Sequence, residues 1–553
     1  MNQVPPKLVM LVVLDGWGIA AGGPGNAISL TQTPNMNRFY ASYPHSELGA
    51  SGESVGLPRS EPGNTETGHL NLGAGRIVYQ DLQRINMNIA DGSFYRNQVL
   101  IGAIDHARVS GGNLHYMGLI GAGGVHSNIE HLYALIELAK KHEFNRVFLH
   151  LFTDGRDSPP TSAKTYVSEI RNVINKQEIG TIATIMGRYW AMDRDLRWDR
   201  TKKAYEALTK GVGNLVKTPE EAIEFSYSEG KTDEFIEPAI ISGPDGKPVI
   251  TVKENDSIVF FNFRIDRPRQ LSSAFVFDDF SKANIPVGFD PYQAKYLKTH
   301  LPLPTPPVIK EPFARGPKLK NLYYVTMTEY GQAILEAGAK VAFPPETVDI
   351  PLGKVISDTG FRQLRACESE KERFVTFYFN GQKEDPFPGE DRLIIPSLKV
   401  STYDLTPEMS ARSVTDGVLK KLEAFPDYKF ILVNYANPDM VGHTGNIGAA
   451  AKTCQIVDEC LGKLSQWILA YGGLMIITAD HGNVEQMIND QTGEIETEHS
   501  GNPVPFIAVS NAFEGNSTVL PTGILADIAP TILKYLKIEI PTVMTGKNLL
   551  DNF

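Results

Sequence analysis

The sequence predicts an α/β fold with buried parallel strands and more than one domain. Short apolar runs rich in β-branched residues alternate with longer amphipathic stretches, which is typical of parallel strands covered by helices on both faces. The chain has 553 residues, 42% of them hydrophobic, so it can bury large cores. Polar residues that can bind ligands follow directly after the apolar runs, as expected at the functional edge of such a sheet.

The predicted strands matter mainly for the residues that follow them. In open α/β sheets, ligands bind beyond the carboxyl ends of the strands. The predicted strands are residues 8–14, 114–120, 146–152, 257–263, 430–435 and 474–478. After them come, in the same order, Asp15, then His126, then Asp154, Arg156 and Asp157, then Arg264 and Arg267, then Asp439 and His443, and then Asp480 and His481. This succession predicts a site assembled from many strand ends.

Asp/His groups and arginine-rich groups occupy different parts of the chain. Asp and His groups occur in the first 80 residues and again after residue 430, whereas arginine-rich groups lie between residues 150 and 270. The segment 299–318 is Pro-rich and is typical of a linker. We therefore expect an outer domain of residues 1–81 and 314–553, with an inserted domain of residues 82–313. The joins near Arg84 and Pro312 would form a two-stranded hinge.

Composition excludes several classes of partner. Lys plus Arg number 53 against 64 Asp plus Glu, a net charge of −11, which argues against broad binding to nucleic acid or to an anionic membrane. Cys367, Cys454 and Cys460 form no CxxC pair, so neither a disulfide framework nor a cysteine zinc site is indicated. The apolar run at 8–14 is too short for a membrane span and precedes no cleavage site. A cytoplasmic protein is expected.

Carboxylates and imidazoles from both ends of the chain are candidate metal ligands. Asp439 and His443 stand four apart, so one helical turn would bring both to one face. Asp480 and His481 are adjacent and would diverge in an extended segment, which suits two neighbouring ions. Each pair alone could be a surface pair or a turn. The whole set would leave ligands surplus around one ion, whereas two ions would use them all: Asp15, Asp439, His443, Asp480, His481 and His499.

The chemistry of these ligands indicates which metal they would hold. The set contains oxygen and nitrogen donors and no sulfur, which favours Mn²⁺, with Co²⁺, Zn²⁺ and Mg²⁺ as alternatives. The Gly-rich stretch 63–69 adds the hydroxyl of Thr65, a poor nucleophile that a divalent cation would activate. If Thr65 heads a helix, the helix dipole would also favour a bound phosphate. Asn64 or Thr65 could instead serve only as an N-cap, and the loop alone leaves both interpretations open.

A second group of residues is suited to binding anions. Arginine forks bind carboxylate and phosphate through paired hydrogen bonds, although any single arginine could simply pair with a nearby Asp. The expected ligand is small and carries at least two negative groups. No P-loop motif occurs, so ATP is not implied. Lys371 could be a catalytic cation or part of a solvated charge run. The candidate arginines are Arg156, Arg188, Arg194, Arg197, Arg200, Arg264, Arg267 and Arg269, and the turns before His126 and around Arg156 and Asp157 favour a binding role for those three residues.

Longer motifs carry a family resemblance. The stretches "VVLDGWG", "GNTETGHLNLGAGRIVYQDLQRIN", "TDGRDSPP", "GRYWAMDRDLRWDR", "FNFRIDRPRQ", "DMVGHTG" and "TADHGN" resemble those of cofactor-independent phosphoglycerate mutases. The resemblance runs in the same order from about Leu8 to Asn548. It implies an α/β fold with an alkaline-phosphatase-like, doubly wound sheet domain and an inserted second α/β domain, the transferase domain.

The resemblance also assigns roles to individual residues. It implies a substrate-binding group of His126, Arg156, Asp157, Arg188, Arg194, Arg264, Arg267 and Lys371. It implies one manganese ion held by Asp439, His443 and His499, and a second held by Asp15, Asp480, His481 and Thr65. The chain departs from the family at two positions, with Thr65 in place of the usual nucleophilic serine and Thr67 in place of valine. The nucleophile would then be a threonine.

The implied activity is the interconversion of 3-phosphoglycerate and 2-phosphoglycerate through a phosphothreonine, without bisphosphoglycerate. Thr65 would attack the phosphoryl group, Lys371 would neutralise developing charge, and Asp157 would shuttle protons at the glycerate hydroxyls. Water must be excluded, or the enzyme would be a phosphatase. The alternatives are a metal-dependent phosphatase, another phosphomutase of the superfamily, or a non-catalytic phosphometabolite-binding protein. We expect a monomer.

Overall fold

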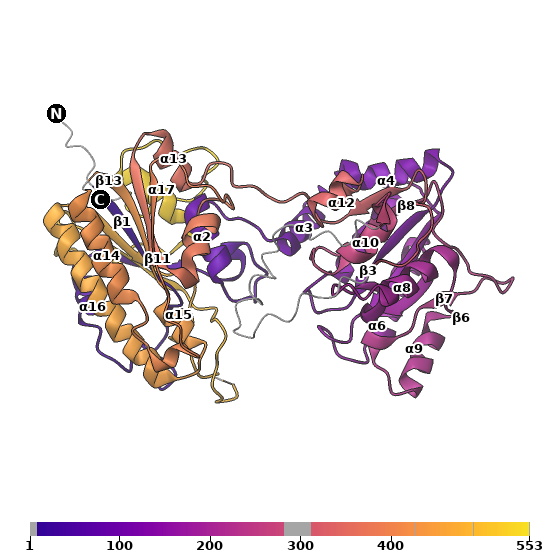
Figure 1. Ribbon diagram of the computed structural model, residues 1–553, viewed down its shortest axis with the longest axis horizontal. Helices are drawn as coiled ribbons and strands as arrows, with labels where there is room; N and C mark the ends of the chain where they lie inside the picture. Colours follow the sequence, from indigo (N-terminus) through magenta and orange to yellow (C-terminus); the bar gives the residue numbers. More distant parts are fainter. Residues whose placement is uncertain (1–7, 281–310, 426, 490, 552–553) are drawn as a thin grey trace. The chain divides into compact units, whose positions relative to one another are not determined.

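The computed structural model describes residues 8–280, 311–425, 427–489 and 491–551. The chain forms two compact units, of which the first combines Met1–Gln80 with Glu346–Phe553 and the second is Asp81–Pro345. Each unit contains an eight-stranded sheet with helices packed against it (Figure 1). The prediction of an α/β fold is confirmed.

The sheet of the first unit is parallel at its centre. Its strand order is β12-β11-β13-β1-β14-β15-β2-β16, with β15 antiparallel to both β14 and β2. Because both faces are covered, the central strand β1 is buried along its whole length, which explains its unbroken apolar sequence. The strands are β1 (Val9–Leu14), β2 (His45–Gly49), β11 (Arg362–Glu368), β12 (Glu390–Ile395), β13 (Tyr428–Tyr435), β14 (Leu474–Thr478), β15 (Val504–Val509) and β16 (Gly523–Ile524).

Helices cover both faces of this sheet. In Figure 1, α14 (Ala411–Ala424) and α16 (Ile447–Tyr471) lie on one face, and α2 (Thr65–Ala74) and α17 (Ile528–Tyr535) lie on the other. The long helix α16 begins where the Asn446 side chain accepts a hydrogen bond from the Ala449 N–H, and it ends at Gly472 in the left-handed conformation. The remaining helices of this unit are α1 (Pro34–Ser42), α13 (Leu352–Asp358) and α15 (Asn437–Gly442).

The sheet of the second unit has the order β10-β9-β8-β3-β4-β5-β7-β6 and is parallel except between β5 and β7. Residues of β3 alternate between two cores, with Leu114 and Tyr116 in one and Met117 and Leu119 in the other. Both faces of the sheet are therefore buried. The strands are β3 (Leu114–Ile120), β4 (Val147–Thr153), β5 (Thr181–Gly187), β6 (Asn214–Val216), β7 (Ala239–Ile241), β8 (Ser257–Phe260), β9 (Tyr323–Thr326) and β10 (Lys340–Val341).

Different helices form the two cores of the second unit. The first core takes residues from α4 (Gln98–Val109), α5 (Ile129–Lys141), α6 (Ala163–Gln177) and α9 (Pro219–Ser228). The second takes residues from α8 (Trp198–Lys210), α10 (Pro268–Val276) and α12 (Gln332–Glu336). The helices α3 (Asp81–Ala90) and α7 (Arg188–Ala191) also belong to the described part of this unit. Among the described residues, no helix is both long and apolar enough to cross a membrane.

The predicted second domain boundary, between residues 313 and 314, is wrong. The units divide between Pro345 and Glu346, because β9 and β10 extend the second sheet beyond β8. Pro312 therefore does not lie where the chain passes between units, and the hinge expected there is misplaced. The first boundary lies between Gln80 and Asp81, against the predicted 81 and 82. Residues 299–310 of the expected linker lie outside the described residues.

The six predicted strands correspond to β1, β3, β4, β8, β13 and β14, although β8 ends at Phe260 and not at residue 263. Strand β11 was missed because a charged residue, Arg365, stands in its middle. The Arg365 side chain is fully buried, with its guanidinium carbon 4.9 Å from the ring centre of Phe379 and 5.3 Å from that of Phe430. Aromatic contacts of this kind let an arginine occupy an interior strand.

Glu368, at the end of β11, is a buried carboxyl group that should make stability depend on pH. It is 1% exposed, and among the described residues its Oε2 has no hydrogen-bond partner. Desolvation raises its pKa to about 7, whereas an unfolded glutamate titrates near about 4.3. Because the folded pKa is raised, the contribution to stability is complete below about pH 4.3 and is lost as pH rises through 7.

Glu368→Gln should therefore stabilise the protein much more at pH 8 than at pH 5. The gain at alkaline pH should approach about 4 kcal/mol, because the pKa rises from about 4.3 to about 7 and each pKa unit corresponds to about 1.4 kcal/mol. Urea unfolding at the two pH values measures it, with the exposed Glu423→Gln as control. An equal effect of Glu368→Gln at both pH values would contradict the assignment.

Candidate active site

The carboxyl ends of four neighbouring parallel strands carry the candidate catalytic residues of the first unit. The strands β11, β13, β1 and β14 are adjacent, so their ends lie along one edge of the sheet. Asp15 follows β1, and Asp480 and His481 follow β14. Asp439 lies in α15 just after β13, and Lys371 lies just after β11. The fold thus brings together residues that are far apart in the sequence.

Thr65 is the first residue of α2, and its hydroxyl faces this edge. The N-cap is Asn64, whose side chain accepts a hydrogen bond from the Thr67 N–H at 2.9 Å. The Thr65 Oγ1 lies 3.0 Å from His481 Nε2 and 3.1 Å from Lys371 Nζ. The Thr67 hydroxyl instead donates to Asn64. Thr65, and not Thr67, therefore presents its oxygen to the ligand groups.

Asp439, His443 and His499 form the first ligand group. The Nε2 atoms of both histidines lie 3.1 Å from Asp439 Oδ1 and 3.1 Å from each other. Their Nδ1 atoms lie 2.7 Å and 2.9 Å from the carbonyl oxygens of Thr497 and Gly63, which places the ring hydrogen of each neutral histidine on Nδ1. The lone pairs of both Nε2 atoms then face a carboxylate oxygen.

This arrangement fits a divalent cation. Ligand atoms bound at about 2.1 Å in tetrahedral or octahedral geometry lie roughly 3.0–3.4 Å apart, as these three atoms do. Although burial lowers the pKa of His443, ion pairing with Asp439 raises it overall. Burial, followed by the proximity of His481, lowers the pKa of His499. A proton and a cation therefore compete for the same nitrogen of His443.

Asp15, Asp480 and His481 form the second ligand group, and all three are fully buried. The His481 Nε2 lies 3.5 Å from Asp15 Oδ1 and 3.6 Å from Asp480 Oδ2. Burial disfavours the charged imidazole, but Asp480 and Asp15 outweigh it and raise the pKa of His481 to about 9. Within the described residues, Asp480 Oδ2 has no hydrogen-bond partner. Two buried carboxylates require compensating positive charge, so this group also fits a cation.

Lys371 connects the two ligand groups with Thr65. Its ammonium lies 2.7 Å from Asp15 Oδ1 and 2.7 Å from Asp439 Oδ2, and it is 3% exposed. Burial disfavours the charged form, but these carboxylates raise the pKa of Lys371 above its usual value. The side chain is therefore a buried cation beside Thr65 and not part of a solvated charge run.

His69 and Asn434 were not predicted, and they hold the carboxylates of the second group. The His69 Nδ1 lies 3.0 Å from the Thr65 carbonyl oxygen and 3.2 Å from Asp480 Oδ2, so it carries the ring hydrogen. The Asn434 amide donates to His69 Nε2 at 3.1 Å and to Asp15 Oδ2 at 2.8 Å. Both nitrogens of His69 thus have partners, and ligand atoms of His69, Asp15 and Asp480 also lie within 4.8 Å of one another, close enough to hold a metal ion. The signal was a polar Asn inside the apolar strand β13.

In the second unit, the candidate anion-binding residues also follow four neighbouring strands. The strands β8, β3, β4 and β5 are parallel and adjacent. Arg188 is the first residue of α7, directly after β5, and Arg194 follows α7. His126 comes after β3, Arg156 and Asp157 after β4, and Arg264 and Arg267 after β8.

Arg188 is the buried centre of this group. It is 2% exposed, and one terminal nitrogen donates to both Asp154 and Asp157 at 2.5 Å. Burial raises the pKa of Asp157, but the hydrogen bond and charge of Arg188 outweigh it and lower the pKa overall. Asp157 is therefore ionised at neutral pH. Asp154, which directly follows β4, was expected at this strand end but was assigned no binding role.

His126 lies between two carboxylates. Its Nε2 is 3.7 Å from Asp157 Oδ2, and its Nδ1 is 3.6 Å from Asp266 Oδ1. Burial, followed by the charge of Arg188, lowers the pKa of His126 to about 3, so the ring is neutral. Asp266, also missed, accepts a hydrogen bond from Arg194 at 2.5 Å.

The remaining arginines leave positive charge in excess. Burial, followed by the charges of Arg188 and Arg194, lowers the pKa of Arg267 to about 10. An anion bound here would relieve this repulsion, which is the electrostatic property expected of a phosphate or carboxylate site. The Arg156 side chain is 56% exposed and lies 3.7 Å from Glu234, so solvent reaches it most freely.

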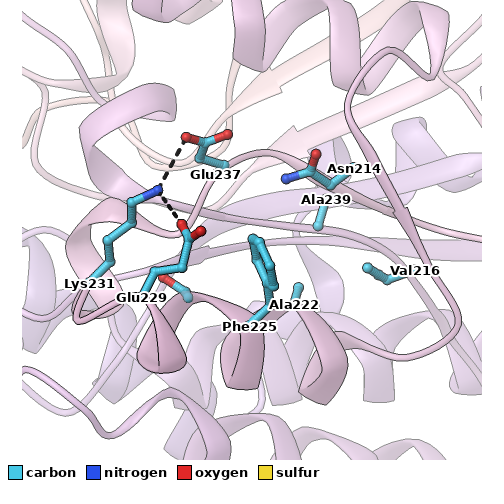
Figure 2. A pocket seen from close by; sticks show the side chains of 9 residues that line it. Asn214, Val216, Ala222, Phe225, Glu229, Lys231, Glu237 and Ala239 are labelled. Atoms are coloured by element: carbon cyan, nitrogen blue, oxygen red, sulfur yellow. Dashed lines mark hydrogen bonds and ion pairs between the residues drawn. The ribbon is translucent and has the colours of Figure 1, made fainter.

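A separate cavity of about 220 Å³ lies between β6, β7 and α9 (Figure 2). At its rim, Lys231 is paired with Glu229 at 2.9 Å and with Glu237 at 3.5 Å. None of the predicted site residues lines it. The cavity is therefore not part of the candidate site.

Known proteins resemble this chain over nearly its whole length. A family model described as the N-terminus of BPG-independent PGAM matches residues 85–332, which lie within the second unit. The 2,3-bisphosphoglycerate-independent phosphoglycerate mutase of Moorella thermoacetica is 49% identical over 542 residues, covering 98% of both chains. The chain belongs to this family. The mutase of Clostridium novyi is 48% identical over 98% of this chain and 99% of its own.

A solved structure extends the similarity to the fold of this mutase family. The phosphoglycerate mutase of Leishmania mexicana, determined at low cobalt concentration, is 27% identical with a TM-score of 0.56. The match covers 99% of this chain and 98% of that one. In the present mutase family member, the predicted metal-ligand residues converge in the first unit, and the predicted anion-binding residues converge in the second.

Proposed function

We propose that the chain interconverts 3-phosphoglycerate and 2-phosphoglycerate through a phosphothreonine at Thr65, without bisphosphoglycerate. The observation that supports this most directly is the position of the Thr65 hydroxyl, 3.0 Å from His481 Nε2 and 3.1 Å from the Lys371 ammonium. A buried hydroxyl between a lysine ammonium and a candidate metal-binding imidazole is arranged as a nucleophile. The relatives that match nearly the whole chain carry the same activity in their names.

Two divalent cations, most favourably Mn²⁺, are the cofactors of this proposal. One would be held by Asp439, His443 and His499, and the other by Asp15, Asp480, His481 and Thr65. When bound, they lower the pKa of the Thr65 hydroxyl and place positive charge beside the oxygens of the phosphoryl group that is transferred. The oxygen and nitrogen donors suit Mn²⁺, Co²⁺, Zn²⁺ or Mg²⁺.

The protein's own residues perform the transfer in two steps. The deprotonated Thr65 oxygen forms a bond to phosphorus while the bond from phosphorus to the glycerate oxygen breaks, and Lys371 stabilises the charge that develops. Ionised Asp157 takes the proton of the other glycerate hydroxyl and passes it to the glycerate oxygen released in the first step. The deprotonated hydroxyl then attacks phosphorus, and the bond from phosphorus to the Thr65 oxygen breaks.

The substrate must stay bound between these steps. The arginines Arg188, Arg194, Arg264 and Arg267, with Arg156, would hold the carboxylate and phosphate through paired hydrogen bonds. Neutral His126 can donate a hydrogen bond to the glycerate or accept one from it. The pairing of Asp157 with Arg188 keeps the carboxylate ionised, which is the form that accepts a proton.

An enolase-coupled assay of purified protein with 3-phosphoglycerate tests this function. We expect turnover in Mn²⁺ that is the same with and without added 2,3-bisphosphoglycerate. Release of inorganic phosphate in step with substrate loss would identify a phosphatase instead. A strict requirement for bisphosphoglycerate would contradict the phosphothreonine route.

A further inference from the structure

The buried carboxylate of Glu485 joins the three loops that carry most of the candidate metal ligands. Its Oε2 accepts hydrogen bonds from the backbone N–H groups of Gly18 at 2.9 Å and Asn483 at 2.8 Å. Its Oε1 accepts from the Ser500 hydroxyl and from the Asn502 side-chain amide. The loop of Gly18 follows Asp15, that of Asn483 follows Asp480 and His481, and Ser500 follows His499 directly.

The surrounding backbone leaves room for this carboxylate. A Cβ atom on Gly18 would lie closer to the Glu485 carboxylate than van der Waals contact allows. The same holds for Gly482, whose added Cβ would meet both Glu485 and Ser500. The two glycines therefore allow close approach of the loops to the carboxylate, and a side chain at either position would push them apart.

The hydrogen bonds of Glu485 come from neutral donors. The residue is 2% exposed, and no ion pair joins it to a cationic side chain in the part of the chain that the structure describes. A buried carboxylate of this kind is stable only when all its acceptor sites are used, so it holds its donors firmly. Its negative charge also favours cations bound to the loops that it joins.

We propose that Glu485 is a positioning residue that preorganises the loops of Asp15, Asp480, His481 and His499 for divalent cations. It touches neither substrate nor the reacting atoms and acts through the ligands. This inference rests on the proposed function, because it requires that those residues bind metal. Groups that orient metal ligands in this way typically change metal affinity by about 10- to 100-fold.

The test is titration of metal-free protein with Mn²⁺ by calorimetry, using Glu485→Gln and Glu485→Ala. Glutamine has the size of glutamate, and its one oxygen can still accept hydrogen bonds from the Gly18 and Asn483 N–H groups. Its NH₂ group, however, would face the Ser500 and Asn502 donors and could not accept their hydrogen bonds. We expect Mn²⁺ affinity about 10-fold weaker for glutamine and about 100-fold weaker for alanine. At saturating Mn²⁺ the glutamine variant should approach the wild-type kcat.

A matched control separates positioning from general loss of stability. Asp458 is likewise buried, and its carboxylate accepts from the backbone N–H groups of Asn35 at 3.1 Å and Met36 at 2.7 Å, at the start of α1. None of these residues is a candidate ligand. Asp458→Asn should lower the melting temperature and leave Mn²⁺ affinity unchanged.

Each outcome decides the question. Wild-type Mn²⁺ affinity in both folded Glu485 variants would overturn the proposal, and so would an equal loss of affinity in Asp458→Asn. If alanine prevents folding, the glutamine variant alone decides, since it retains the shape of the side chain. A wild-type protein that binds no Mn²⁺, Co²⁺, Zn²⁺ or Mg²⁺ would overturn the proposed metal site itself, and with it this inference.

Discussion

Thr65→Ala is expected to abolish mutase turnover, whereas Thr65→Ser should retain it. The alanine variant lacks the only oxygen at this position that can accept the phosphoryl group, and loss of a nucleophile typically costs about 10⁴-fold or more in kcat. Serine restores the hydroxyl without the extra methyl group, which restricts rotation about χ1 in threonine. The enolase-coupled assay measures all three proteins at saturating Mn²⁺.

Thr67→Ala is the matched control for this experiment. Its hydroxyl lies two residues along the same helix and bonds to Asn64, not to the ligand groups. We expect a small loss of stability and nearly full activity. Substantial turnover by Thr65→Ala, or a loss of activity by Thr67→Ala as great as that predicted for Thr65→Ala, would remove Thr65 from the mechanism.

Removal of divalent cations should have the second large effect. Without them, the facing Nε2 atoms of His443 and His499, 3.1 Å apart, lose the cation that would bind both. The buried carboxylates of Asp15 and Asp480 are then left with less positive charge around them. Activity should fall to background after chelation and return with Mn²⁺ or Co²⁺. The melting temperature should also fall, because a cation present at 100 times its Kd stabilises the folded protein by about 2.7 kcal/mol per site.

A chelator saturated with Mn²⁺ beforehand provides the control for direct effects of the chelator. Activity and melting temperature are read on the same samples, so inactivation through metal loss can be told from unfolding. Full activity in rigorously metal-free protein would contradict the role assigned to these ligands. An unchanged melting temperature on chelation would show that the ligand groups are stable without a cation.

Much of the candidate site could be predicted because its residues follow buried strands. Asp15 and Asp480 each come directly after an apolar run, and parallel strands place their carboxyl ends at one edge. Local pattern was sufficient there. The predicted second domain boundary was wrong because it depended on contacts that are not local. The Pro-rich segment precedes β9 and β10, and the local sequence does not show which sheet a short strand joins.

The supporting residues could not be predicted because their role depends on contacts across the fold. In the local sequence, His69 is one more polar residue in a helix. Only its hydrogen bond to the Thr65 carbonyl and the 3.2 Å between its Nδ1 and Asp480 Oδ2 show what it does. From the local sequence, Glu485 is likewise only a charged residue in a loop. Asp266, between Arg264 and Arg267, reads as an ordinary ion-pair partner.

By itself, the sequence determined the α/β class, the strands that carry the site and the types of ligand at their ends, because hydrophobic periodicity and side-chain chemistry are local properties. Only the tertiary structure decided which of these residues meet. Lys371 and Asp15 stand 356 positions apart, yet their charged groups lie 2.7 Å from each other. Hydrogen-bond direction, the tautomer of each histidine and the burial of each charge arise from such contacts, so they exist only once the chain has folded.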